Sequence, residues 1–216
     1  AVKTNKKLCE EIGINQSAAV TCVKPSGTVS QLVDAASGIH ARHNPYYIRT
    51  VRGDNKDPLT MFMKDKQIPN EPDFTAPESV TVFSFPMKSP QGAVCRHDMS
   101  AIEQLELWHK IAENYCEHKP SVTISVKEHE WLDVGAWCWN NFDALSGISF
   151  LPFSDHSYKQ APYQDIDQGA YEKALEAMPP DIDWTELQMF ERGDTTSGSQ
   201  ELACAGGVCE IVDIGA

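Results

Sequence analysis

Two cysteines near the C-terminus are the residues of this chain whose types and spacing most clearly suit a chemical reaction. Cys204 and Cys209 stand five positions apart, with Gly206 and Gly207 between them. Two thiols at this spacing can close a small disulfide ring and pass electrons between partners by thiol–disulfide exchange. The small, polar residues 193–200 before them predict a flexible linker. Half of a zinc site, or no role at all, remain alternatives, but no further Cys or His ligand lies close in sequence.

A second candidate site is the stretch from Lys24 to Ser30, which follows a short apolar run. Proline fixes its own φ and disfavours helix in the residue before it, so strand character is expected to end at Lys24. Residues 29–36 are compatible with a helix, so the amides of residues 27–30 are expected to lie unpaired at its N-terminus, where they can bind phosphate. The P-loop spacing is absent, and a turn that only starts a helix is the alternative. The candidate phosphate-binding residues are Pro25, Ser26, Gly27, Thr28, Val29 and Ser30.

A turn-rich connection follows at residues 37–45 and contains His40, Arg42 and His43. These side chains can bind anions or move protons, so His40 and Arg42 are candidates for an active-site loop. A solvated loop without a function is the alternative.

Composition limits the classes of function. The 216 residues, 41% of them hydrophobic, are enough to bury a sizeable core. The formal net charge of −13 argues against a nucleic-acid polymer or an anionic membrane as partner. There is no apolar run near the roughly 20 residues of a membrane span and no signal peptide, so a cytoplasmic location is expected. The seven scattered cysteines favour reduced thiols over a disulfide scaffold.

The spacing of apolar residues predicts alternating strands and helices. Residues 1–13 resemble the end of an amphipathic helix, which suggests that the sequence is a fragment. Ser100 and Glu103 form a capping box at the start of the clearest helix, whose apolar stripe should face a sheet. The expected strands are Tyr46–Val51, Ser79–Phe85, Ser121–Val126 and Gly147–Phe153, and the expected helices are Pro58–Lys66, Ser100–Glu117, Glu128–Leu145, Tyr171–Met178 and a turn or two at Asp183–Leu187.

Strand–helix–strand repetition predicts parallel pairing and therefore an α/β layer or barrel. Ligands in such folds bind at the carboxyl ends of the strands. The aromatic segment Phe150–Tyr163 follows the last predicted strand. It either covers the open end of a core or lines a pocket for a flat ligand.

Four motifs together carry a resemblance to one enzyme family. They are KPSGTVS at residues 24–30, SGIHAR at 37–42, GISFLPF at 147–153 and ACAGGVCE at 203–210. In combination they resemble the C-terminal part of an adenosylcobalamin-dependent (class II) ribonucleoside-triphosphate reductase, over nearly the whole chain. The resemblance implies an α/β barrel of ten strands in two five-stranded halves, of which this chain supplies the later strands and a redox tail.

The resemblance also implies roles for the candidate residues. The Pro25–Ser30 turn would hold the substrate's phosphates, and Cys204 and Cys209 would re-reduce the active site with electrons from a thioredoxin-type protein. Residues 1–192 would belong to the barrel, with roughly 96–192 contributing to the adenosylcobalamin-binding face, and residues 193–216 would form the flexible tail. No metal site is expected.

The radical cysteine, the active-site cysteine pair and the effector site of the family would lie upstream of residue 1. The remaining cysteines, Cys9, Cys22, Cys95, Cys116 and Cys138, are therefore interpreted as buried or incidental thiols. A class I or III reductase fragment and a non-enzymatic thiol carrier are the alternative functions. The HAR connection and the CAGGVC tail favour class II, and a thiol carrier does not need the long α/β body.

Overall fold

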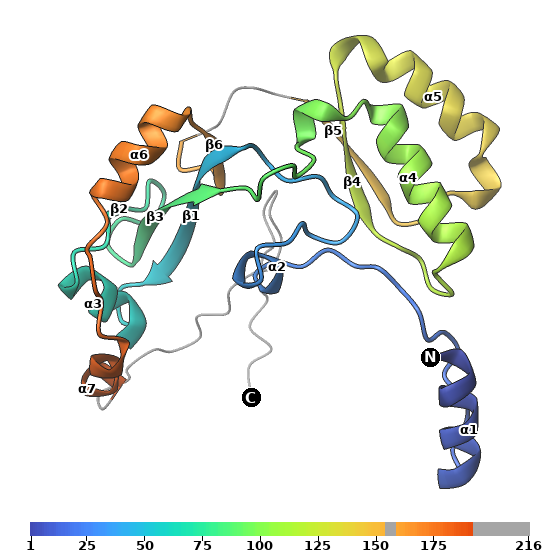
Figure 1. Ribbon diagram of the computed structural model, residues 1–216, viewed down its shortest axis with the longest axis horizontal. Helices are drawn as coiled ribbons and strands as arrows, with labels where there is room; N and C mark the ends of the chain where they lie inside the picture. Colours follow the sequence, from blue (N-terminus) through green and yellow to red (C-terminus); the bar gives the residue numbers. More distant parts are fainter. Residues whose placement is uncertain (154–158, 192–216) are drawn as a thin grey trace. The chain divides into compact units, whose positions relative to one another are not determined.

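The computed structural model describes residues 1–153 and 159–191 (Figure 1). The chain divides into two compact units, whose segments alternate along the sequence. The described residues of the first unit are 1–45 and 89–153, and those of the second are 46–88 and 159–191. The predicted linker, Cys204 and Cys209 lie outside the described residues. Across the described part of the chain, no helix is long and apolar enough to cross a membrane.

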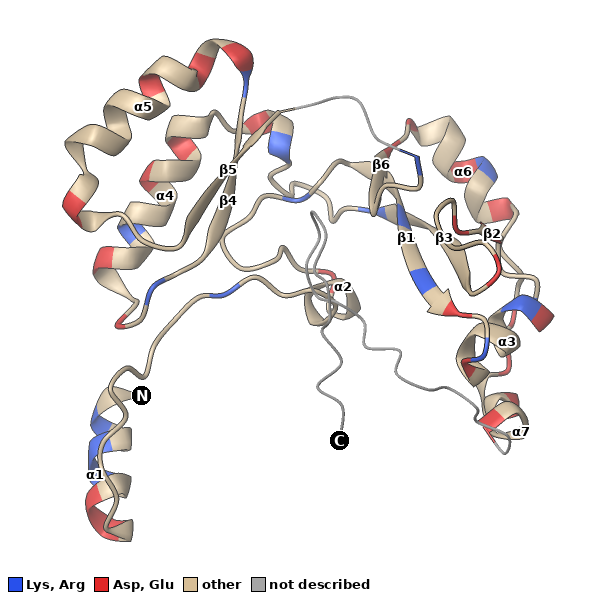
Figure 2. Ribbon diagram, turned by 180° about the vertical axis from the view of Figure 1, so that it is seen from behind, with Lys and Arg blue, Asp and Glu red and all other residues tan. Residues whose placement is uncertain are grey.

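A parallel β–α–β element forms the centre of the first unit. Strands β4 (Val122–Val126) and β5 (Ile148–Pro152) pair in parallel, with Val122 opposite Ile148 and Val126 opposite Pro152. Neither strand carries a charged residue (Figure 2). The crossover between them contains the 3₁₀ turn η2 (Glu128–Glu130), helix α5 (Trp131–Asn140) and the 3₁₀ turn η3 (Phe142–Ala144).

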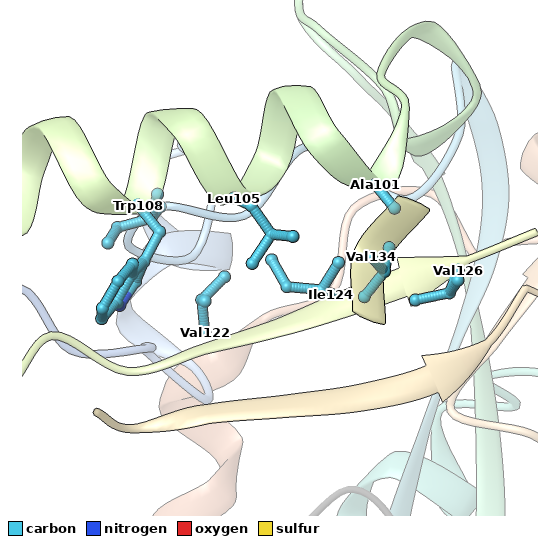
Figure 3. Packing of buried hydrophobic residues seen from close by; sticks show 8 residues of the cluster. Ala101, Leu105, Trp108, Val122, Ile124, Val126 and Val134 are labelled. Carbon is cyan, nitrogen blue, oxygen red and sulfur yellow. The ribbon is translucent and has the colours of Figure 1, made fainter. Parts of the chain in front are cut away.

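Helix α4 (Ala101–Asn114) packs on strand β4. Figure 3 shows Ala101, Leu105 and Trp108 on the helix side and alternate β4 residues opposite them. Leu105 and Trp108 are fully buried, because the 3.6-residue helical period places both on one face and the two-residue strand period supplies the matching face. The buried cluster consists of Ile39, Ala101, Leu105, Trp108, Val122, Ile124, Val126 and Val134.

The remaining helices of the first unit are short or terminal. Helix α1 (Val2–Ile12) ends at Gly13, whose φ of 72° is in the left-handed region that favours glycine at this position. Helix α2 (Val29–Leu32) is a single turn, and the 3₁₀ turn η1 (Arg96–Asp98) precedes α4. Ser100 caps α4 by accepting the Glu103 amide at 3.2 Å, while the Glu103 carboxylate accepts the Ser100 amide at 2.8 Å. The predicted capping box is therefore confirmed.

The second unit is built on an antiparallel sheet. Its strand order is β2 (Asn70–Pro72), β3 (Val80–Lys88), β1 (Tyr46–Asp54) and β6 (Tyr163–Asp165). Strands β1 and β3 pair along their full lengths, with Tyr46 opposite Lys88. The helical elements are α3 (Pro58–Asp65), α6 (Gln168–Glu176), the 3₁₀ turn η4 (Trp184–Glu186) and α7 (Leu187–Glu191), and Phe62, Met63, Ile68 and Phe83 form the buried core.

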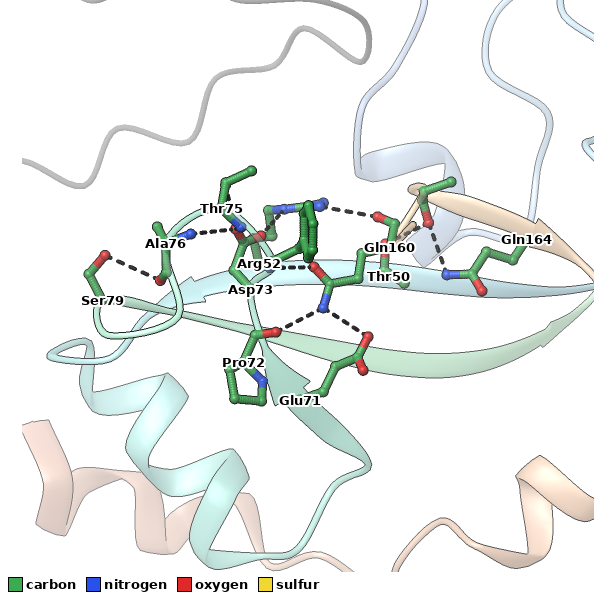
Figure 4. Close-up of polar contacts among 12 residues, drawn as sticks. Thr50, Arg52, Glu71, Pro72, Asp73, Thr75, Ala76, Ser79, Gln160 and Gln164 are labelled. Atoms are coloured by element: carbon green, nitrogen blue, oxygen red, sulfur yellow. Dashed lines mark hydrogen bonds and ion pairs between the residues drawn. The ribbon is translucent and has the colours of Figure 1, made fainter. Parts of the chain in front are cut away.

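A polar network joins the loop after β2 to the residues before β6 (Figure 4). The buried Gln160 side chain donates to Glu71 Oε1 and to the Pro72 carbonyl, and its Oε1 accepts the Phe74 amide at 2.8 Å. Arg52 bridges the two segments, donating to Asp73 Oδ2 at 2.8 Å and to the Gln160 carbonyl at 3.1 Å. Strand β6 is thus held to the sheet by side chains as well as by its own short ladder.

The α/β class and the predicted strands and helices are confirmed. Parallel pairing is correct for β4 and β5 but wrong for the second unit, where every pair is antiparallel. Residues 18–24 form no strand, although they lie beside the chain that leads into β4, where Ser121 donates to the Val23 carbonyl. The helix expected from residue 29 to 36 is only the turn α2, and the ten-stranded barrel stays a prediction.

Candidate functional site: the Pro25–Ser30 loop

The candidate phosphate loop is closed by hydrogen bonds between serines. The Ser26 amide donates to Ser37 Oγ at 2.7 Å, and Ser37 Oγ donates to the Ser26 carbonyl at 2.8 Å. Ser26 Oγ accepts the Ser30 amide at 2.9 Å. Ser26 therefore has its amide, carbonyl and hydroxyl all engaged, which fixes the turn at its centre.

Three amides of the loop match the sequence expectation. The N–H groups of Gly27, Thr28 and Val29 donate to no other described residue, and all three residues are exposed. The Ser30 amide differs from the expectation, because the Ser26 hydroxyl caps it. Since α2 has one turn only, its dipole contributes little, and any affinity for an anion must come from the three exposed amides and the nearby hydroxyls.

Lys24 does not point its ammonium group into this loop. Its Nζ donates to the Lys119 carbonyl at 2.7 Å and to Ser121 Oγ at 2.8 Å, just before β4. The Lys24 carbonyl lies close to Gly38, where an added Cβ would come within 2.8 Å of that oxygen. Gly38 also has a φ of +61°, so the closeness and the backbone conformation both require glycine.

His40 links this region to strand β4. The Thr123 amide donates to His40 Nε2 at 2.9 Å, and His40 Nδ1 lies 2.7 Å from the Ser37 carbonyl. An amide can only donate and a carbonyl can only accept, so these partners assign the neutral tautomer with its proton on Nδ1. His40 therefore holds the loop against β4, and both of its ring nitrogens are used in doing so.

Arg42 is buried and holds the chain that follows α2. Its Nη1 donates to the Ala35 carbonyl at 2.7 Å, and its Nη2 contacts Asp34 Oδ1 at 2.8 Å. Its backbone N–H donates to the Val94 carbonyl, and its carbonyl accepts the Arg96 amide. The guanidinium fork is thus committed to protein partners, which is a structural role for a residue that the sequence placed in a candidate active-site loop.

An open pocket of about 490 Å³ borders the 34–42 segment. Apolar side chains line most of it, including Ile39, Val94 and Leu107. Its three carboxylates are already hydrogen-bonded: Asp34 to Arg42, Asp98 to the Cys95 amide and Glu103 to the Ser100 amide. The acidic rim makes this pocket unsuitable for phosphate groups and leaves the Pro25–Ser30 loop as the better anion site.

The described rings of the aromatic stretch 150–163 pack against residues of their own units. Phe150 packs against the core of the first unit, and Phe153 is covered by Arg96, Lys127 and the His97 ring. Tyr163 belongs to the second unit, where Arg49 lies 4.4 Å above its ring. The exposed residues of this stretch on β5 are Leu151 and Pro152.

The five described cysteines are free thiols, and Cys9 and Cys95 are buried. Burial raises the pKa of the Cys95 and Cys138 thiols, which disfavours the reactive thiolate. Within residues 1–153 and 159–191, no group of three or more His, Cys, Asp or Glu side chains is placed to hold a metal ion. These placements agree with the interpretation of these cysteines as incidental.

Sequence reasoning missed Ser37 and Thr123 as partners of the loop. The Ser37-Gly38 pair is a common turn dipeptide and could have drawn attention to the first. Thr123 makes its contact through its backbone amide, so the type of its side chain gives no signal in the sequence.

No family model matches the chain. Curated relatives, however, align with almost all of it. It is 28% identical over 215 residues to the adenosylcobalamin-dependent ribonucleoside-triphosphate reductase of Lactobacillus delbrueckii subsp. bulgaricus, an alignment of 97% of this chain and 29% of the relative. The enzyme of the same name from Euglena gracilis is 28% identical over 205 residues, covering 94% of this chain and 28% of that protein.

A solved structure gives the same answer. The crystal structure of a B12-dependent (class II) ribonucleotide reductase matches with a TM-score of 0.73 and 26% identity, covering 88% of this chain and 26% of that one. The chain is homologous to the C-terminal part of these reductases. It spans less than a third of the length of the curated relatives it matches. Their names favour the class II interpretation over a class I or III fragment or a thiol carrier.

Proposed function

We propose that this chain forms the C-terminal part of an adenosylcobalamin-dependent ribonucleoside-triphosphate reductase, which converts ribonucleoside triphosphates into deoxyribonucleotides for DNA synthesis. The observation that carries the proposal is the agreement of two comparisons, sequence over 97% of the chain and fold over 88% of it. The radical cysteine and its acid–base partner would be supplied by the part of the enzyme that this chain does not contain.

In this proposal the Pro25–Ser30 loop binds the phosphates of the substrate. Its exposed amides at Gly27, Thr28 and Val29 supply three donors, and Thr28, which carries a hydroxyl, is exposed beside them. Backbone donors arranged around a turn bind anions without needing a cation, which suits a protein of net charge −13. His40 and Arg42 act by holding the surrounding chain, not by touching the reacting atoms.

The remaining roles follow from the same proposal. Strands β4 and β5 with α5 form a parallel β–α–β element of the kind from which a ten-stranded α/β barrel is built. Adenosylcobalamin would supply the radical that starts the reaction, and among the described residues of the 150–163 stretch the exposed Leu151 and Pro152 are candidates for an apolar contact with it. Cys204 and Cys209 relay electrons from a thioredoxin-type reductant in the cytoplasm.

Gly27→Val in the complete reductase tests the phosphate assignment. An added Cβ at Gly27 meets no atom within 4 Å, so the fold accommodates a side chain there. That side chain would stand where the phosphates bind, and the KM for the ribonucleoside triphosphate should rise by about tenfold or more while the affinity for adenosylcobalamin stays unchanged.

Gly135→Val is the matched control, because its added Cβ also meets open space, on helix α5. This control should leave the KM unchanged. An unaltered KM in Gly27→Val would contradict the phosphate assignment, and a complete enzyme that reduces no ribonucleotide with adenosylcobalamin would contradict the proposed function itself.

A further inference from the structure

Ser37 holds the candidate phosphate loop from outside it. Its hydroxyl both accepts the Ser26 amide at 2.7 Å and donates to the Ser26 carbonyl at 2.8 Å, eleven residues away in sequence. One side chain therefore satisfies both backbone groups of the residue at the centre of the turn. Within the described residues, the loop amides that remain open are those of Gly27, Thr28 and Val29, so the position of Ser26 sets the direction in which they point.

Ser37 is in turn held by strand β4 through His40. The imidazole donates from Nδ1 to the Ser37 carbonyl at 2.7 Å and accepts the Thr123 amide at Nε2 at 2.9 Å. Thr123 lies in strand β4, between the buried Val122 and Ile124. A continuous series of hydrogen bonds thus runs from the sheet through His40 and Ser37 to Ser26.

The backbone geometry fits this arrangement. Gly38 follows Ser37, and its left-handed φ of +61° turns the chain so that Ser37 reaches Ser26 and His40 reaches β4. The carbonyl of Lys24 lies where a Cβ on Gly38 would be, within 2.8 Å. The two segments, 24–26 and 37–38, therefore approach each other as closely as their backbones permit.

We infer that Ser37 is a positioning residue for substrate phosphate, an inference that rests on the proposed function. It orients the amides of Gly27 to Val29 before the substrate arrives, and His40 transmits the rigidity of β4 to it. Pre-arranged donors bind an anion more tightly because the loop loses less conformational freedom on binding. Since Ser37 does not contact the reacting atoms, its loss should weaken substrate binding and leave the chemical step intact.

Ser37→Ala in the complete reductase tests the inference. Two hydrogen bonds of ordinary strength are lost, so the KM for the ribonucleoside triphosphate should rise about tenfold while kcat stays within about twofold. Ser37→Thr retains the hydroxyl and should restore the KM. Ser149→Ala, an exposed serine on β5, is the matched control and should leave the KM unchanged.

A second measurement does not depend on catalysis. Hydrogen exchange of the amides in residues 24–32 should be faster in Ser37→Ala than in the wild-type protein, and inorganic triphosphate should slow it in the wild type more than in the variant. If Ser37→Ala folds poorly, Ser37→Cys replaces it in both measurements, because cysteine keeps the side-chain volume but makes only weak hydrogen bonds. Ser37→Cys should then show the raised KM and the faster exchange.

An unchanged KM together with unchanged exchange in the Ser37 variants would overturn the inference. A fall in kcat at constant KM would overturn it as well, because it would place Ser37 in the chemical step. If the wild-type protein reduces no ribonucleotide, the proposed function fails, but the exchange experiment still decides whether Ser37 orders the loop.

Discussion

Asp73 is the residue whose ionisation the fold of the second unit controls most strongly. Burial alone would raise the pKa of its carboxyl group, but donors from Thr75, Arg52 and the Ala76 amide outweigh burial and lower that pKa to about 2. Thr75 Oγ1 donates to Oδ1 at 2.6 Å and Arg52 Nε to Oδ2 at 2.8 Å (Figure 4). The native structure thus stabilises the charged form of this carboxylate.

This carboxylate predicts an acid-dependent loss of stability. Its pKa is depressed in the native state, so its contribution is complete above the unfolded-state value near 3.8 and is lost as the pH falls towards 2. The contribution amounts to about 2 kcal/mol. Asp73→Asn should lower the free energy of unfolding at pH 7, and urea titrations should show its difference from wild type shrinking as the pH falls from about 4 to about 2.

Thr75→Ala removes one of the donors to Asp73 and should give an intermediate pH dependence. If Asp73→Asn loses stability with acid as steeply as the wild type, another group controls the acid transition of this unit.

At the residue scale, local signals were predictable and distant partners were not. The Ser100–Glu103 capping box depends on residues three apart, and the sequence predicts it correctly. The bond from Thr123 to His40 joins residues 83 positions apart and exists only because the fold brings them together. For the same reason, sequence could not decide whether Arg42 faces a ligand or, as the structure has it, Asp34 and the Ala35 carbonyl.

At the element scale, the junction before β5 depends on Gly147. Its φ is +63°, and a Cβ there would lie 2.6 Å from the Pro120 carbonyl, which leads into β4. The Gly147 carbonyl in turn accepts the Val122 amide at 3.1 Å, which begins the β4–β5 ladder. The two parallel strands can start side by side only if their preceding residues come this close.

Gly147→Ala should therefore destabilise the protein by about 2–4 kcal/mol, through left-handed strain and displacement of the Pro120 backbone. Gly135→Ala is the matched control on α5, where an added Cβ meets open space. It should instead stabilise the helix by about 0.5–1 kcal/mol. Urea unfolding followed by tryptophan fluorescence measures both, and equal effects of the two substitutions would refute the role assigned to Gly147.

The sequence predicted the type of most elements better than their direction. The helical period of α4 and the alternation in β4 follow from which residues are apolar, and both segments lie where they were expected. The direction of β3 relative to β1 depends on how residues 55–79 return the chain, and no periodicity encodes that path. The short strands β2 and β6 were missed because three residues are too few to show alternation.

At the scale of the whole molecule, the chain has a buried cluster in each unit and a candidate phosphate loop. It spans less than a third of the length of its relatives. The interleaving of its two units also follows from the chain path, since residues 46–88 leave the first unit before α4 and β4 complete it. In the proposed function, the loop and the cysteine pair would be two contributions to an active site whose other residues lie elsewhere in the enzyme.

The cysteine pair predicts a separation of single from multiple turnover in the complete reductase. A relay must reach a protein reductant in one state and a narrow active site in the other, so its two thiols must lie on a flexible arm. The small, polar composition of residues 193–200 predicts such an arm before the cysteine pair. In each cycle the Cys204–Cys209 dithiol would reduce the active-site disulfide, become a disulfide itself and be re-reduced by the thioredoxin-type protein. Replacing both cysteines with serine should preserve one turnover of the pre-reduced enzyme and stop further turnovers with that reductant.

A small dithiol that diffuses into the active site should bypass the missing relay and restore part of the multiple turnover. Product formed in a rapid-quench experiment measures the first turnover, and steady-state rates with each reductant measure the rest. Full multiple turnover of the double serine variant with the protein reductant would exclude the relay. Loss of the first turnover as well would assign the pair a structural or metal-binding role, because a thiol pair that acts only in re-reduction is not needed until the active-site cysteines have been oxidised once.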